Sequence, residues 1–116
     1  MLVYTVVGLL FGLMGLAAFI DPRGLLARLE LPATTATARN EVQAVYGGFG
    51  LAMAAMLVLP HWRPELHTGI GYVVAAALAG MAAGRVIGLA REGANRWAWL
   101  FLGIEAAGAA ALFAAA

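Results

Sequence analysis

Four apolar runs, each close to the length of a bilayer crossing, constrain this chain most. We place them at residues 2–20, 38–59, 68–90 and 97–115. About 20 residues of α-helix, at a rise of 1.5 Å each, cross the hydrocarbon of a membrane. Only 11% of the residues are charged, against about 25% in a soluble domain. We therefore predict an all-α fold, an integral membrane four-helix bundle that forms one domain over residues 1–116.

Residue usage excludes several kinds of chemistry. The chain has no Cys and no Ser, which removes disulfides, thiolate catalysis and Ser nucleophiles. A net charge of +1 offers no electrostatic footprint for nucleic acid. The turn before the third run holds His61, Glu65 and His67, but no fourth ligand is evident, and none of the spans contains a His for haem. We predict no metal site and no cofactor.

The segment between the first two runs carries an amphipathic pattern. We expect a short helix over residues 22–31. Asp21 would cap its start, Pro22 suits its first turn, and Pro32 would end it. The leucines share one helical face and the charged residues lie elsewhere: Leu25, Leu26 and Leu29, against Arg23, Arg28 and Glu30. This pattern predicts a short helix in the membrane interface. A plain polar loop is the alternative. For residues 2–20 a signal peptide is the alternative, but no basic residue precedes them.

The arginines predict one orientation in the membrane. The first and third loops, with the adjacent helix ends, hold Arg23, Arg28, Arg39, Arg85, Arg91 and Arg96. The opposite side holds only Arg63. By the positive-inside rule, the first and third loops face the cytoplasm and both termini lie outside it. Trp62, Trp97 and Trp99 stand at positions suited to interfacial anchoring.

Glycines at four-residue spacing predict where helices approach one another. The third run holds Gly80, Gly84 and Gly88, the first holds Gly8 and Gly12, and the second holds Gly48 with Ala52, next to Gly47, which is also read as a packing site. The fourth run has Gly103, Ala107 and Ala111 at the same spacing. In lipid, such small residues let backbones come close. The partner is either a helix of the same chain or one of a neighbouring copy, so homo-oligomerisation stays open.

Three charged residues in or beside the spans predict a buried polar cluster. Glu105 lies eight residues beyond Trp97, so it is roughly 12 Å deep from the side of the third loop. Arg85 lies five residues before Ala90, about 7 Å from that side. Because each Cα–Cβ bond tilts toward its helix N-terminus, Arg85 and Glu105 lean toward each other. Glu41 opens the second run on the same side, and the side chains that would add hydrogen bonds are Tyr46 and either Asn40 or Gln43.

This cluster has two interpretations. Intramembrane ionisable residues mark functional sites by default, and one Arg facing two carboxylates leaves an acid that could bind a proton or a cation. Alternatively, Arg85 reaches the interface, Glu41 favours the positive end of its helix, and a pair of Arg85 with Glu105 only fastens two helices.

The positions of these polar residues also resemble those in a known protein family. Asn40-Glu41-x-x-Ala44-x-Tyr46-Gly47-Gly48, then Gly84-Arg85-x-x-Gly88 and the single Glu105, resemble a family of small bacterial four-helix inner-membrane proteins of unknown function. The architecture is similar to that of DoxX-like proteins. The resemblance covers nearly the whole chain, although Gln43 stands where a basic residue is expected. It implies a fold and a bacterial inner-membrane location, and it implies no established activity.

Sequence reasoning thus favours a protein in the lipid bilayer that binds a small molecule or a lipid headgroup, or that serves as an accessory subunit. The expected pocket is polar and lies in the cytoplasmic third of the bundle. One alternative is a membrane-embedded enzyme, an isomerase or a glutathione-transferase-like protein. Another is a proton-coupled exporter, which the uncharged first run disfavours.

The orientation is testable with fusions after Ala116. Because the cytoplasmic side is set by the Arg bias, alkaline phosphatase fused there is expected to be active and a green fluorescent protein dark. The opposite pattern contradicts the predicted orientation. Activity from both fusions would indicate that the chain inserts in two directions.

Overall fold

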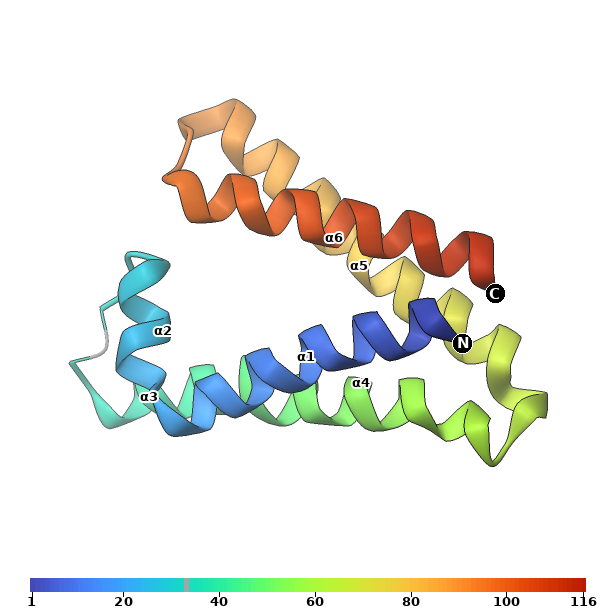
Figure 1. Cartoon of the computed structure of the whole chain (residues 1–116). Helices are drawn as coiled ribbons and strands as arrows, with labels where there is room; N and C mark the ends of the chain where they lie inside the picture. Colours follow the sequence, from blue (N-terminus) through green and yellow to red (C-terminus); the bar gives the residue numbers. More distant parts are fainter. Residues whose placement is uncertain (33) are drawn as a thin grey trace. The chain divides into compact units, whose positions relative to one another are not determined.

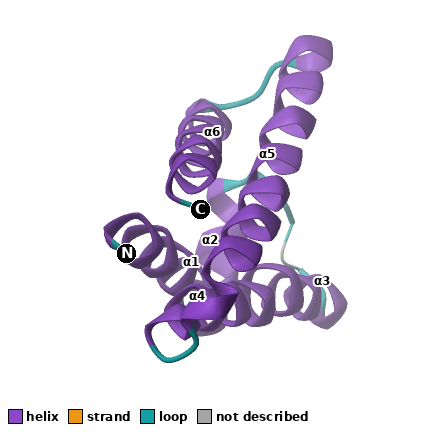
Figure 2. Cartoon of the chain, turned by 90° about the vertical axis from the view of Figure 1, so that its right-hand side faces the viewer, coloured by secondary structure: helices purple, strands orange, loops and turns teal. Residues whose placement is uncertain are grey.

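The computed structural model describes residues 1–32 and 34–116. Its elements, in chain order (Figure 1), are α1 (Leu2–Ile20), α2 (Pro22–Arg28), α3 (Ala36–Val42), the π-helix η1 (Gln43–Gly48), α4 (Phe49–Val58), the 3-10 helices η2 (Leu59–His61) and η3 (Pro64–Leu66), α5 (His67–Glu92) and α6 (Arg96–Ala115). The described ranges contain helices, turns and loops but no strand (Figure 2). The prediction of an all-α fold is confirmed.

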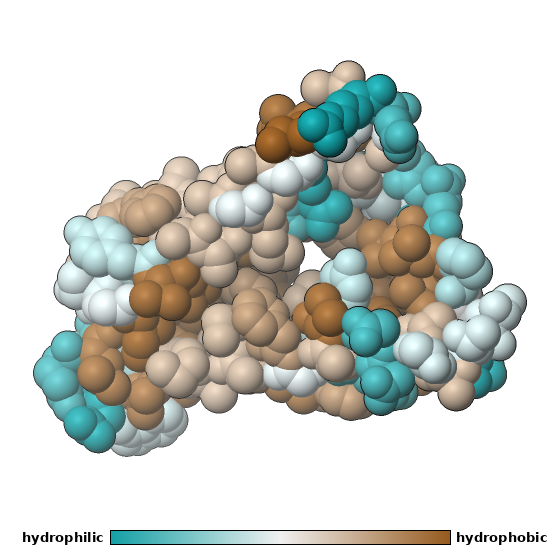
Figure 3. Space-filling model, turned by 180° about the vertical axis from the view of Figure 1, so that it is seen from behind, coloured by the Kyte–Doolittle hydropathy of each residue, from teal (hydrophilic) through white to brown (hydrophobic). Residues whose placement is uncertain are grey.

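Four helical segments are long and apolar enough to cross a membrane. They run over Leu2–Ile20, Ala36–His61, Pro64–Glu92 and Arg96–Ala115. The second joins α3, η1, α4 and η2 without a break, and the third includes η3. Figure 3 shows apolar side chains over most of the visible surface, with hydrophilic side chains in a few separate patches. The chain is therefore a multi-pass membrane protein.

Contacts divide the chain into two compact units. One comprises residues 5–58, and the other comprises residues 1–4 together with 59–116. The first unit contains most of α1 with α2 to α4, and the second contains the α5–α6 hairpin. We describe each unit by itself, and the single domain over residues 1–116 stays a prediction.

In the first unit, α1 and α4 approach through glycines. A Cβ atom added at Gly15 would lie 2.9 Å from the carbonyl oxygen of Gly47, and one at Gly50 would lie 2.9 Å from that of Phe11. Real Cβ atoms do not come so close to backbone, so both positions accept only glycine. Gly8 and Gly12, expected at this contact, lie beside Leu57 and Ala54.

The adjacent glycines Gly47 and Gly48 lie in the π-helical turn η1 and differ in their surroundings. The hydrogen bonds of this turn join residues five apart, so it inserts one residue relative to an α-helical turn. Gly47 lies beside Phe19 as part of the contact with α1, whereas Gly48 is exposed and meets only its own helix. Of the two predicted glycines, Gly47 therefore faces α1 and Gly48 does not; Gly50, three residues after Gly47 and so on the same side of the helix, makes the other close contact.

The short helix α2 ends earlier than the sequence pattern predicts. The Leu31 amide donates to the Leu26 carbonyl at 2.9 Å and the Glu30 amide to that of Ala27 at 3.1 Å, the two bonds of a Schellman ending. Glu30 adopts the left-handed conformation, with φ 58°. The helix thus ends at Arg28 rather than at Leu31, and the ending precedes Pro32. Leu26 is buried, in agreement with the leucine face.

In the second unit, α5 and α6 form an antiparallel hairpin closed by a cap at each helix end. Gly93 ends α5 with φ 72°, a conformation that favours glycine. The Asn95 side chain then accepts from the amides of Trp97 and Ala98 at the start of α6. The buried apolar side chains of these two helices are Ile70, Val74, Ala75, Leu78, Ala82, Ala109 and Leu112.

The open end of the hairpin is also tied by hydrogen bonds. The Nε2 atom of His67 lies 2.9 Å from the Ala115 carbonyl, and the Thr68 hydroxyl donates to the backbone oxygen of Ala116 at 3.0 Å. The Tyr4 hydroxyl donates to the His67 carbonyl at 2.6 Å, and the two rings stack at 4.2 Å. These bonds satisfy last-turn carbonyls of α6 and hold the start of α1 to the hairpin.

The stripe of Gly80, Gly84 and Gly88 makes no close contact within the hairpin. A Cβ atom added at any of the three meets no atom within 4 Å. The hairpin instead closes around Gly71, where an added Cβ would lie 2.1 Å from the Tyr4 hydroxyl oxygen. Packing through the Gly80–Gly88 stripe, including homo-oligomerisation, stays a prediction.

The glycine contact predicts a specific loss of stability. The substitution Gly50→Ala is expected to lower the free energy of unfolding by about 1–3 kcal/mol, because its methyl group overlaps the Phe11 carbonyl. Gly84→Ala is the matched control and is expected to change stability by less than about 1 kcal/mol. Unfolding of both variants in detergent micelles measures the difference. Equal stability of the two variants would contradict the close approach of α1 and α4.

Candidate functional site

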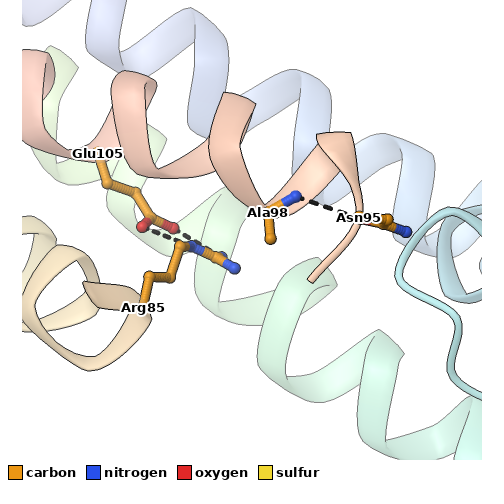
Figure 4. Close-up of polar contacts among 4 residues, drawn as sticks. All are labelled: Arg85, Asn95, Ala98 and Glu105. Carbon is orange, nitrogen blue, oxygen red and sulfur yellow. Dashed lines mark hydrogen bonds and ion pairs between the residues drawn. The ribbon is translucent and has the colours of Figure 1, made fainter. Parts of the chain in front are cut away.

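The α5–α6 hairpin contains a paired Arg and Glu (Figure 4). The Arg85 Nε donates to Glu105 Oε2 at 2.7 Å, and its Nη2 donates to Oε1 at 2.8 Å. The side chain of Glu105 is 7% exposed and that of Arg85 is 24% exposed. The bidentate geometry engages both carboxylate oxygens, which makes it the strong form of this ion pair.

The two side chains meet because the hairpin is antiparallel. Arg85 lies eight residues before Gly93, and Glu105 lies ten residues after Asn95, so the residues reach similar depths on either side of the turn. Phe101 lies one turn before Glu105, and its ring centroid is 5.2 Å from the guanidinium carbon of Arg85. This arrangement adds a cation–π contact to the pair. Aromatic and carboxylate partners thus hold the guanidinium against α6.

This pair supplies cohesion between α5 and α6. Removing either charge leaves the other poorly solvated, whereas together they are neutral and hydrogen-bonded. The sequence leaves two interpretations of the polar residues, a functional site or a pair that joins two helices. The contacts of Arg85 and Glu105 with each other are those of a pair that joins two helices. Glu105 has no carboxylate oxygen left without a donor.

A separate hollow of about 290 Å³ lies in the first unit, between α2 and the start of the second span. Side chains of α2, of the α2–α3 connection, of α3 and of η1 form its wall. The lining residues are Leu26, Leu31, Pro32, Ala38, Glu41, Val42, Val45 and Tyr46. The wall is therefore apolar apart from one carboxylate and one phenol.

Glu41 and Tyr46 are the predicted site residues that line this hollow. Glu41 is exposed, and its side chain has no hydrogen bond or ion pair with any residue in the described part of the chain. Tyr46 is half-buried within η1. Asn40 is exposed and Gln43 is half-buried, and neither is among the lining residues. A cluster of Glu41 with Arg85 and Glu105 involves both units and stays a prediction.

Sequence reasoning missed two features of the hollow. It placed α2 flat in the membrane interface and did not make it a wall of the pocket, although the apolar residues Leu26, Leu31 and Pro32 were visible as a signal. It also read residues 38–59 as one regular helix and had no signal for the π turn. The predicted pocket was polar, whereas six of the eight lining side chains of this hollow are apolar.

The other candidate ligands for metal serve structural roles or lie exposed. His67 lies against the Ala115 carbonyl, and the Arg63 Nε donates to Glu65 Oε1 in an exposed pair. Within residues 1–32 and 34–116, no three His, Cys, Asp or Glu side chains gather closely enough to hold a metal ion.

Comparison with known proteins assigns the chain to a family. A family profile described as Domain of unknown function (DUF4345) matches residues 2–116. The chain therefore belongs to this family, in agreement with the predicted membership of a family of unknown function that covers nearly the whole chain. Neither the curated proteins nor the solved structures contain a match.

The buried pair predicts a large effect of one substitution. Arg85→Ala is expected to lower the free energy of unfolding by about 3 kcal/mol or more, because it leaves Glu105 charged and unpaired. Arg63→Ala removes the exposed pair with Glu65 and is expected to cost less than about 1 kcal/mol. Unfolding in micelles compares the two. The double variant Arg85→Ala/Glu105→Ala should recover part of the loss, and an Arg85→Ala protein as stable as wild type would contradict a buried pair.

Proposed function

We propose that this membrane protein binds a small amphiphilic molecule in the hollow formed by α2, α3 and η1. The observation that carries the proposal is an apolar hollow with a single unpaired carboxylate, Glu41, at its wall. Burial of an apolar ligand segment against the leucines and valines would provide affinity. Glu41 and Tyr46 would fix the orientation of the polar head.

The π turn supports a functional role for this region. A single π turn within an α-helix has poorer intrinsic stability, and such turns frequently occur at functional sites. Here η1 contributes Val45 and Tyr46 to the wall. The same segment holds Gly47 against α1. The irregular backbone is thus anchored by α1 and presents side chains to the hollow.

The size of the hollow favours a small ligand. Pockets for drug-sized molecules enclose about 300–1,000 Å³, and this hollow is about 290 Å³. It would accept an alkyl segment with a compact head rather than a complete phospholipid. Its position at the start of the second span suits a ligand that enters from the membrane interface.

In the proposed orientation the hollow lies at the cytoplasmic side of a bacterial inner membrane, with both termini outside. The support is the distribution of arginines, because the loop that contains α2 holds Arg23 and Arg28 while the opposite side has Arg63 alone. The amphipathic α2 would lie at the cytoplasmic interface, with its buried Leu26 toward the hollow.

Photolabelling tests the proposed function without presupposing the charge of the ligand. The probe is a long-chain fatty alcohol with a diazirine in its chain, added to protein in phosphatidylcholine vesicles. We expect saturable labelling of the lining residues, located by proteolysis and tandem mass spectrometry, above an unsaturable background at lipid-facing positions such as Val73 and Ile87, which are exposed. Excess unlabelled alcohol should remove only the saturable part.

Paired variants make the test specific. Ala38→Trp fills the hollow with a bulky ring and should abolish the saturable labelling. Ala36→Trp adds the same ring to α3 at an exposed residue outside the lining and should preserve it. Labelling that never saturates, or that survives Ala38→Trp, would contradict a ligand site in the hollow.

A further inference from the structure

We infer that the ligand of the hollow is a single-chain amine, with an alkyl segment against the apolar wall and an ammonium head beside Glu41. This inference rests on the proposed function and adds the chemical class of the ligand. It follows from the charge of the wall, from the placement of Tyr46 and from the absence of any basic residue among the lining side chains.

The charge of the wall selects a cation. Glu41 is the one ionisable acid or base among the eight lining residues apart from the phenol of Tyr46. Its carboxylate has no ion-pair or hydrogen-bond partner within the described ranges. An ammonium group beside this carboxylate would form a charge-assisted hydrogen bond where the apolar wall excludes part of the water. An anionic head would meet repulsion.

The arginines of the same unit are not part of the wall. Arg39 precedes Glu41 by two residues in α3, so it points about 200° round the helix from Glu41. Arg28 lies at the end of α2, where its Nη1 reaches the Gly24 carbonyl of its own helix at 3.5 Å. None of the three arginines of this unit, Arg23, Arg28 and Arg39, is among the lining residues. The charge that faces the hollow is therefore negative.

Tyr46 adds a second contact suited to an ammonium head. Tyr46 lies in the π turn η1, five residues after Glu41, and both residues line the hollow. An aromatic face attracts a cation, and a phenol oxygen accepts a hydrogen bond from an ammonium. The two side chains together offer a negative and a polar aromatic partner for one head.

An aminophospholipid headgroup fits this wall less well. Its phosphate would stand close to its amine and would require a cationic partner, which the lining residues do not provide. The small volume also matches one alkyl segment better than two acyl chains. We therefore assign the site to a single-chain amine and make the phospholipid an arm of the test.

Competition against the photolabel separates this inference from the proposed function. Dodecylammonium and dodecanol are compared at pH 7 as competitors of the saturable fatty-alcohol label in phosphatidylcholine vesicles. We expect dodecylammonium to compete about tenfold more strongly, a gain typical of one charge-assisted contact. Glu41→Gln, which keeps a hydrogen-bond acceptor but removes the charge, should bring the two competitors within about twofold of each other. Glu30→Gln, which removes an exposed carboxylate outside the lining, should keep the preference.

The outcomes are distinct. Saturable labelling with equal competition by both heads, or a preference that survives Glu41→Gln, would overturn the amine assignment and leave the proposed function standing. Absence of saturable labelling overturns both. Addition of phosphatidylethanolamine to the vesicles should not displace the label, and displacement comparable to that by dodecylammonium would show that the amine is a lipid headgroup, contrary to our assignment.

Discussion

The constraint on which this structure depends is that lipid solvates neither charge nor an unpaired backbone group. Every span is therefore helical, and helices gain cohesion from close backbone approach and from polar pairs rather than from apolar burial. Gly15 and Gly50 provide the first kind of contact in one unit. The bidentate pair of Arg85 with Glu105 provides the second kind in the other. Both kinds of contact use few residues, which explains how a chain with 11% charged residues can hold its helices together.

Because lipid solvates charge poorly, the acidic side chains Glu41 of the second span and Glu105 of the fourth span have different roles. Glu105 is buried, and both of its oxygens accept hydrogen bonds from Arg85, so its charge is compensated within the chain. Glu41 is exposed beside an apolar hollow without such a partner. A compensated charge stabilises a fold, whereas a charge without a partner beside an apolar wall is available to a ligand. This difference is the physical basis of the proposed function.

Much of the fold follows from the sequence because hydropathy and helix signals are local. The span of residues 2–20 matches α1, and Asp21 with Pro22 marks the start of α2 as the structure has it. The meeting of Arg85 and Glu105 also follows, since depth and Cβ direction in an antiparallel hairpin are simple geometry. The π turn does not follow, because no residue pattern in the second span marks where its hydrogen bonds change from four to five residues apart. The early end of α2 depends on Glu30 accepting a left-handed backbone, which local propensity disfavours. The wall of the hollow includes residues from the π turn and from the end of α2. The sequence therefore predicts Glu41 and Tyr46 as site residues but not the apolar hollow that they line.

The most direct test of a ligand site at Glu41 and Tyr46 is a nuclear magnetic resonance spectrum of protein labelled with ¹³C in its tyrosine rings. The chain has three tyrosines, and Tyr46→Phe identifies the signal of Tyr46. Our account predicts that dodecylammonium, relative to the same amount of dodecanol, shifts the Tyr46 signal and leaves Tyr4 and Tyr72 unchanged. It also predicts that Glu41→Gln abolishes the difference. A Tyr46 signal that responds equally to both amphiphiles, or not at all, would contradict it.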